Sequence, residues 1–159
     1  MGEAGVRVAT VDDLDALRAV YRRASWSNEG DRPLLLEHPE WLELDPTGVH
    51  EGRTLAAVDA AGTVAAFATW SDAESALELD ALFTDPDHRR AGHARRLIDA
   101  LDDLAVAAGA TAIVVTANEH AMAFYEAAGF VVTGTAQTAG GPARRMRRGL
   151  SAAGGPASG

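Results

Sequence analysis

Hydrophobic and polar residues alternate along residues 77–82, and this alternation predicts a half-buried β-strand. Asp85-Pro86-Asp87 ends the strand, because proline cannot donate a ladder hydrogen bond. From Gly92 onward the apolar residues recur at three- and four-residue spacing, which predicts a helix with one buried face. These apolar positions are Ala94, Leu97, Ile98, Leu101, Leu104, Ala105 and Ala108. We therefore predict a strand, a turn and a helix over residues 77–104, around which the rest of the chain is arranged.

The same patterns predict the remaining elements, in an order that indicates a mixed α/β sheet. Strands are expected at residues 6–9, 53–59, 63–71, 112–117, 131–138 and 143–150, and helices at residues 10–25, 33–38 and 119–128. We predict an α/β (α+β) fold with about six to seven strands and about four helices. A single domain covers residues 1–150, and a disordered, low-complexity tail covers residues 151–159.

The front of the helix after Gly92 is unusually basic. A helix N-terminus carries partial positive charge, so acidic residues are favoured there. Four arginines surround this end instead: Arg89, Arg90, Arg95 and Arg96. A bound polyanion explains this placement, because backbone N–H groups and guanidinium groups bind phosphate together. The alternative is a solvated basic patch in which Arg96 pairs with Asp99 or Asp103, although this order of charges is the poorer one for a helical pair.

Composition narrows the classes of function. The chain of 159 residues, with 47% hydrophobic and 23% charged residues, resembles an ordinary globular domain. A formal net charge of −9 argues against nucleic acid and anionic membranes as partners. The lack of cysteine excludes disulfides, thiolate metal sites and cysteine nucleophiles, and no histidine pair has metal-ligand spacing, so no metal is expected. Neither a signal peptide nor a membrane span is recognisable, so cytoplasmic is the default location.

Two motifs resemble those of the GCN5-related N-acetyltransferase (GNAT) superfamily. Arg89-Arg90-Ala91-Gly92-His93-Ala94 is similar to its pyrophosphate loop, Arg/Gln-x-x-Gly-x-Gly/Ala, with alanines at two positions where glycine is usual. Asn118, followed by Phe124-Tyr125 and Gly129-Phe130, is similar to its Asn…Phe-Tyr…Gly-Phe signature. The resemblance covers about residues 6–150. It implies a GNAT-like fold whose sheet is splayed between the fourth and fifth strands.

The resemblance implies that acetyl-CoA (coenzyme A) is the cofactor. N–H groups around residues 90–95 would cradle the diphosphate, and Gly92 would let the backbone approach it closely. Leu82 and Thr84 would pair through their backbone with the pantetheine arm, with the Leu82 N–H as oxyanion donor. The cofactor-binding residues implied in this way are Leu82, Phe83, Thr84, Arg89, Arg90, Ala91, Gly92, His93, Ala94, Arg95, Asn118, Phe124 and Tyr125.

The resemblance also implies catalytic roles in a direct attack of an amine on the thioester. Tyr125 is the candidate general acid for the departing thiolate, the alternative being core packing with its hydroxyl bonded elsewhere. Glu78 is the candidate base, because it matches the strand glutamate of the histone-acetylating members. Asp80 lies on the same strand face. The two carboxylates either accept the proton, directly or through water, or bind a cationic substrate, or belong to a solvated face with surface ion pairs.

The acceptor in this prediction is a primary amine of a small molecule or peptide. Tyr21, Trp26 and Trp41 are candidate substrate-contacting residues, because aromatic rings suit a cationic amine. The two tryptophans alternatively cover the core. A homodimer is compatible with the resemblance. The alternative function is a non-catalytic acyl-CoA-binding sensor or partner-binding domain.

The arginines at residues 144–148 alternate around Met146. Charged side chains on an exposed strand discourage pairing with further strands. We therefore predict that this run forms a solvated strand at the edge of the sheet. An acidic partner or a subunit contact is the alternative.

Overall fold

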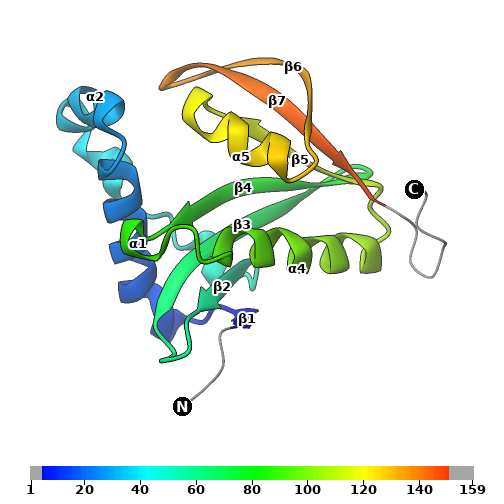
Figure 1. The fold of residues 1–159 in the computed structure, drawn as a ribbon, viewed down its shortest axis with the longest axis horizontal. Helices are drawn as coiled ribbons and strands as arrows, with labels where there is room; N and C mark the ends of the chain where they lie inside the picture. Colours follow the sequence, from blue (N-terminus) through cyan, green and yellow to red (C-terminus); the bar gives the residue numbers. More distant parts are fainter. Residues whose placement is uncertain (1–4, 151–159) are drawn as a thin grey trace. The chain divides into compact units, whose positions relative to one another are not determined.

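The computed structural model describes residues 5–150, and it has the mixed α/β fold that the sequence predicts. Seven strands form a sheet in the order β1-β2-β3-β4-β5-β7-β6, labelled in Figure 1. β4 and β5 run parallel, whereas the pairs β1–β2, β2–β3, β5–β7 and β6–β7 are antiparallel. The tail predicted at residues 151–159 lies outside the described residues.

The chain divides into two compact units, and each takes two separate segments of the sequence. Unit 1 contains residues 1–69 and 81–97, and unit 2 contains residues 70–80 and 98–159. The boundaries fall inside β3, β4 and α4 rather than in loops. These three elements therefore contribute residues to both units.

Unit 1 contains the first helices and an antiparallel part of the sheet. Its elements are β1 (Gly5–Val8), α1 (Leu14–Trp26), α2 (Arg32–Glu37), α3 (Thr47–His50), β2 (Thr54–Val58) and the first part of β3 (Val64–Ala73). α1 buries Leu17, Val20 and Ala24 at the spacing that predicted this helix. α3 was not predicted, because a single turn is too short to produce a helical pattern of hydrophobic residues.

The core of unit 1 also receives the end of β4 (Ala76–Thr84). The ring of Phe83 lies 5.6 Å from that of Phe67 and 4.8 Å from that of Tyr21, measured between centroids. Phe67 is fully buried. The packing of Phe83 fixes the end of β4 and, with it, the start of the loop that follows.

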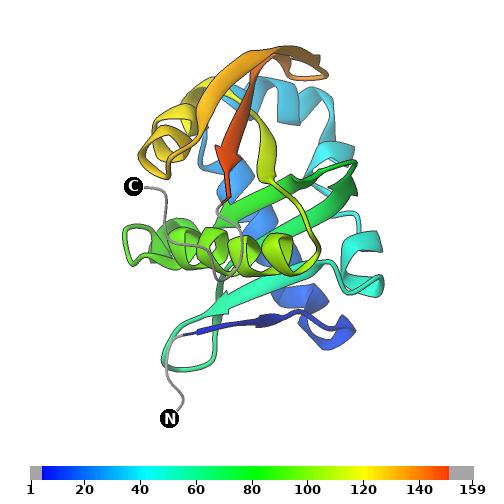
Figure 2. The same ribbon diagram turned by 90° about the vertical axis from the view of Figure 1, so that its right-hand side faces the viewer.

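Unit 2 contains the rest of the sheet and most of α4. Its complete elements are β5 (Ala112–Ala117), α5 (Met122–Ala127), β6 (Val131–Thr138) and β7 (Gly141–Gly149), and α4 (His93–Ala107) contributes its residues from Ile98 onward. Figures 1 and 2 show α5 beside the hairpin of β6 and β7. β4 pairs with β5 from Ala76 and Ala112 to Leu79 and Val115. The registered pairing stops there, although β5 continues to Ala117.

The prediction that residues 144–148 form an edge strand is wrong. These residues lie in β7, which pairs with β5 on one side and with β6 on the other. Arg145 and Arg148 form ion pairs with carboxylates of other elements. An exposed edge strand and an interior strand with paired arginines have the same alternation of charged and apolar residues. The sequence pattern therefore does not distinguish between them.

Candidate functional site

The predicted strand, turn and helix are all present in the structure. β4 ends at Thr84, a 3₁₀ turn covers Pro86–His88, and α4 begins at His93. Asp85 stabilises the turn, because its Oδ1 atom accepts a hydrogen bond from the Asp87 amide at 2.9 Å. The basic loop of residues 89–92 then leads into the first turn of α4.

The backbone of this loop has two left-handed residues, Arg90 with a φ of 64° and Gly92 with a φ of 82°. The conformation is unfavourable at Arg90, because a Cβ atom is present, and such residues often occur at binding sites. A Cβ atom at position 92 would lie 3.2 Å from Arg96 Nη1, so glycine suits both the conformation and the space. The amides of His93 and Ala94 begin α4 without acceptors inside the helix. This end of α4 can therefore hold an anion.

Arg96 supports the loop from within the first turn of α4. Its Nη1 atom donates to the Ala91 carbonyl at 3.3 Å, and its Nη2 atom donates to His93 Nδ1 at 2.6 Å. His93 is only 4% exposed, and burial, followed by the charge of Arg96, lowers its pKa. Nδ1 must be the acceptor, because arginine has only donors. Arg96 thus contacts the loop rather than Asp99 or Asp103, its partners in the basic-patch alternative.

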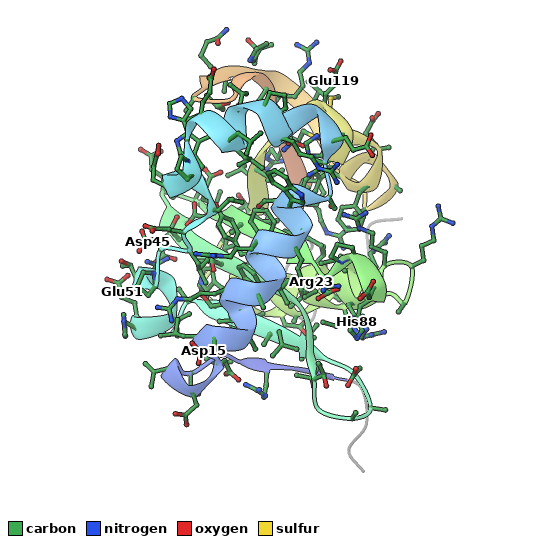
Figure 3. All side chains as sticks on the ribbon, turned by 90° about the vertical axis from the view of Figure 1, so that its left-hand side faces the viewer. Asp15, Arg23, Asp45, Glu51, His88 and Glu119 are labelled. Carbon is green, nitrogen blue, oxygen red and sulfur yellow. The ribbon has the colours of Figure 1, made fainter. Side chains whose placement is uncertain are left out.

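A second set of contacts connects the loop to α1, where Figure 3 labels Arg23. Arg23 Nε lies 3.0 Å from Asp85 Oδ2, and Nη2 lies 2.5 Å from Asp87 Oδ2. Burial opposes ionisation of Asp85, but the Asp87 amide and Arg23 lower its pKa overall. Arg89 donates to Ser27 Oγ at 2.5 Å. The end of α1 therefore fixes both ends of the turn.

Tyr125 lies on α5 and is only 6% exposed. The rings of Phe124 and Phe130 meet it edge to face, with centroids 5.4 Å and 5.2 Å away. Burial raises the pKa of Tyr125, so its hydroxyl keeps its proton at neutral pH. Within residues 5–150 that hydroxyl forms no hydrogen bond. The hydroxyl is therefore free to donate a proton. The alternative, in which the hydroxyl is hydrogen-bonded to another group of the core, is not observed among the described residues.

Asn118 caps the 3₁₀ turn of Glu119–Ala121, which leads into α5. Its Oδ1 atom accepts a hydrogen bond from the Ala121 amide at 3.2 Å. The side chain thus acts as the cap that the sequence position suggests. Because only the oxygen is used in this contact, the side-chain NH₂ group can still donate to a ligand.

Glu78 forms a bidentate ion pair with Arg145 of β7. Arg145 Nη1 lies 2.8 Å from Glu78 Oε2, and Nη2 lies 3.1 Å from Oε1. Nη1 also donates to Thr116 Oγ1 at 2.8 Å. The hydrogen bond with Glu78 raises the pKa of Arg145, despite partial burial. Glu78 is therefore engaged by a permanent cation, whereas Asp80, two residues further along β4, is exposed.

The three aromatic residues predicted to contact substrate have different surroundings. Trp26 borders a cavity of about 430 Å³, whose other lining residues are Arg22, Arg23, Ser27, Leu42 and Pro86. The Tyr21 hydroxyl donates to the Trp41 carbonyl at 2.6 Å. The Trp41 ring is stacked on His38 with centroids 4.2 Å apart. The Arg32 guanidinium lies over the Trp26 ring, 5.3 Å from its centroid, so Trp26 borders the cavity with this cation against its ring. Tyr21 and Trp41 take part in packing within unit 1.

Two arginines with evident roles at these sites were not among the predicted site residues. Arg96 belongs to the basic cluster seen in the sequence, but its partners were expected to be carboxylates. Arg145 was interpreted as part of an edge strand. The alternation around Met146 was a signal of a strand, but nothing in it indicated a partner as distant as Glu78.

Other classes of site are not seen in the part of the chain that the structure describes. Among residues 5–150, no group of three or more histidine, aspartate or glutamate side chains is placed to hold a metal ion. None of the described helices combines the length and hydrophobicity that crossing a membrane requires.

The sequence and the fold are similar to known acetyltransferases. The model of the acetyltransferase (GNAT) family matches residues 11–130. A GCN5-related N-acetyltransferase from Rhodopseudomonas palustris is 22% identical, with a TM-score of 0.75 and coverage of 94% of this chain and 98% of that one. The PaiA N-acetyltransferase from Thermoplasma acidophilum, in complex with coenzyme A, is 18% identical, with a TM-score of 0.72 and coverage of 93% and 99%.

A third similar structure is the ribosomal-protein-S18-alanine N-acetyltransferase from Escherichia coli. It is 23% identical, with a TM-score of 0.67 and coverage of 96% of this chain and 97% of that one. At these identities the likeness establishes the fold. No curated protein matches the sequence.

Proposed function

Because the chain belongs to the acetyltransferase (GNAT) family, whose acyl donor is acetyl-CoA, we propose that it transfers an acetyl group to a primary amine of a small molecule or peptide. The family match carries the proposal. The bound coenzyme A of the Thermoplasma acidophilum structure and the protein alanine acceptor named for the Escherichia coli enzyme support the donor and the acceptor class. We assign this activity to residues 1–150 as one catalytic domain.

The residues of the loop before α4 fit a diphosphate. The His93 and Ala94 amides lie at the positive end of a helix of 15 residues. Gly92 leaves the space that a side chain would take. Arg90 is exposed and forms no ion pair with a described residue, so its charge is available to phosphate. Of the predicted cofactor contacts on β4, we assign Leu82 and Thr84 to backbone contacts, and Phe83 to packing.

Tyr125 is our proposed general acid. The acetyl thioester of the cofactor supplies the acyl group, and the thiolate that leaves must gain a proton. The neutral hydroxyl of Tyr125 can donate this proton. The Tyr125 hydroxyl donates to no acceptor among the described residues, and this supports the acid role over a purely structural one.

Glu78 and Asp80 remain alternative proton acceptors for the attacking amine. Each carboxylate oxygen of Glu78 already accepts a hydrogen bond from Arg145, and this cation opposes protonation of Glu78. Asp80 is exposed and lies two residues further along β4. We propose that one of these two carboxylates, directly or through a water molecule, accepts the proton of the amine.

The test is release of free thiol from acetyl-CoA in the presence of a panel of primary amines, including amino acids, diamines and short peptides. We expect amine-dependent thiol release that exceeds the rate without amine. Binding of acetyl-CoA is measured separately by calorimetry. Tight binding without turnover of any amine would contradict the proposal and would favour a non-catalytic acyl-CoA sensor.

A further inference from the structure

Arg145 uses one edge of its guanidinium group for Glu78 and leaves the other edge open. The Nη1 and Nη2 atoms face the Glu78 carboxylate, and the second Nη1 hydrogen is directed to Thr116 Oγ1. A guanidinium group has five donors in a planar arrangement. The Nε–H and the second Nη2–H, which form the other edge, contact no acceptor within residues 5–150. This free edge has the geometry that binds a carboxylate in a bidentate manner.

The backbone of Arg145 is held firmly. Arg145 is paired with Thr116 of β5 and with Gly134 of β6, so it has strand neighbours on both sides. Its carbonyl accepts a hydrogen bond from Thr133 Oγ1 at 3.3 Å, and the next residue, Met146, is fully buried. The side chain is still 34% exposed. Arg145 is therefore a fixed cation that a dissolved molecule can reach.

The cluster lies where the pairing of two strands ends. The last registered pair of β4 and β5 is Leu79 with Val115. Glu78 precedes this pair on β4, and Thr116 follows it on β5. Arg145 therefore contacts a side chain on each side of the last registered pair.

We propose that Arg145 selects acetyl acceptors that carry a carboxylate near the amine, such as amino acids, and that it disfavours amines with a second positive charge. The proposal rests on the proposed function and specifies its substrate class. The acceptor carboxylate binds the Nε and Nη2 donors of Arg145. A second positive charge on the acceptor gains little from Glu78, because Arg145 already compensates that carboxylate, and it is repelled by Arg145 itself.

This assignment differs from the expectation drawn from the sequence. There, two carboxylates on one strand face favoured a cationic acceptor. In the structure, Arg145 compensates the charge of Glu78 through two hydrogen bonds to its carboxylate, and a third hydrogen bond joins Arg145 to Thr116. Arg145 therefore decides which charge of acetyl acceptor is preferred here, and its remaining donors suit an anionic group.

The test compares matched acceptors that differ only in charge. Alanine and phenylalanine are compared with alaninamide and phenylalaninamide, and putrescine serves as the doubly charged amine. We expect a kcat/KM at least about tenfold higher for each acid than for its amide, as for a charge-assisted hydrogen bond. Arg145→Gln should bring this ratio close to one and increase the activity with putrescine. Arg145→Lys, which keeps the charge but loses the planar edge, should give an intermediate ratio.

Arg147→Gln is the matched control, because Arg147 is exposed on the same face of β7 and forms no ion pair with a described residue. It should keep the wild-type ratio. Thermal melting confirms that each variant is folded. Equal kcat/KM values for acid and amide in the wild type, or an unchanged ratio in Arg145→Gln, would overturn the proposal.

A binding experiment separates this proposal from the proposed function. N-acetylalanine and N-acetylalaninamide are titrated into the protein in the presence of coenzyme A. Tighter binding of N-acetylalanine that is lost in Arg145→Gln supports the carboxylate site, even if no amine is turned over. Equal binding of the two compounds refutes it, even if amines are acetylated.

Discussion

Arg148 of β7 forms a bidentate ion pair with Asp102 of α4. Arg148 Nε lies 3.0 Å from Asp102 Oδ1, and Nη2 lies 2.6 Å from Oδ2. The third nitrogen, Nη1, donates to the Ala128 carbonyl at the end of α5. The two charged side chains are 20% and 24% exposed, so solvent screens the pair only in part. One arginine thus connects three elements of unit 2.

We predict that Arg148→Met destabilises the fold. The substitution leaves the Asp102 carboxylate and the Ala128 carbonyl without this partner, and the expected loss in the free energy of unfolding is about 2 kcal/mol. Urea denaturation followed by circular dichroism measures the loss. Arg147→Met, at an exposed neighbouring position, should change stability by less than about 0.5 kcal/mol. Equal stability of the two variants would contradict the prediction.

Gly92→Asp should weaken the binding of acetyl-CoA by more than about tenfold. The side chain blocks the approach of the backbone and adds a negative charge beside the diphosphate. Isothermal calorimetry with coenzyme A measures the dissociation constant. Gly62→Asp is the matched control, because Gly62 has a similar φ of 85° but no atom within 4 Å of the place that a Cβ atom would take. Loss of affinity in both variants would indicate backbone strain rather than a binding loop.

Tyr125→Phe should lower kcat by about a hundredfold or more, the usual contribution of a positioned acid. The KM for acetyl-CoA should change little, because the aromatic ring and its packing on Phe124 and Phe130 are kept. Thiol release under saturating amine measures kcat. An undiminished kcat would exclude the hydroxyl as the proton donor.

We predict that the affinity for acetyl-CoA decreases at acidic pH, because the His93 ring becomes protonated. Burial lowers the pKa of His93, so the folded protein favours the neutral ring. The stability contributed by the neutral ring is fully present above the ordinary histidine pKa of about 6.5. It is lost as the pH falls through the lower pKa that His93 has in the folded protein. A protonated ring presents a donor to Arg96 Nη2, and the hydrogen bond that supports the loop is lost. His88, 6.0 Å away and paired with Asp59, faces the same ring.

His93→Asn tests this pH dependence. The asparagine oxygen can replace Nδ1 as acceptor but does not titrate, so the decrease in affinity below pH 6.5 should become smaller. Calorimetry from pH 5 to pH 8 gives the two profiles. His50→Asn changes an exposed histidine of α3 and should leave the wild-type profile intact. Identical profiles for wild type and His93→Asn would remove His93 from the explanation.

The elements of the fold were predictable wherever the signal is local. β5 has the predicted limits, because a nearly continuous apolar run flanked by polar residues is unambiguous. α4 begins one residue after Gly92, whose positive φ marks the entry. The place of β7 between β5 and β6 was not predictable, because strand order depends on pairings between residues far apart in the sequence.

In the candidate site, too, features that depend on neighbouring residues were predictable, whereas contacts between distant residues were not. The basic loop was found because its residues are consecutive. Glu78 and Arg145 are separated by 67 positions, and neither residue indicates the other in a single sequence. Arg96 was assigned to carboxylates because charge suggests such partners, whereas a left-handed backbone at Arg90 and Gly92 brings a carbonyl and an imidazole within its reach.

The interleaving of the two units has a consequence for the growing polypeptide. When the first 80 residues have been synthesised, unit 1 still lacks its second segment, which supplies Phe83 to its core. That segment is complete only when residue 97 has left the ribosome, after the first segment of unit 2 has already appeared. No uninterrupted stretch of the chain contains one unit alone. Proteolysis at a single peptide bond should therefore yield no fragment that refolds independently. Each unit can complete its folding only when segments of both units have been synthesised.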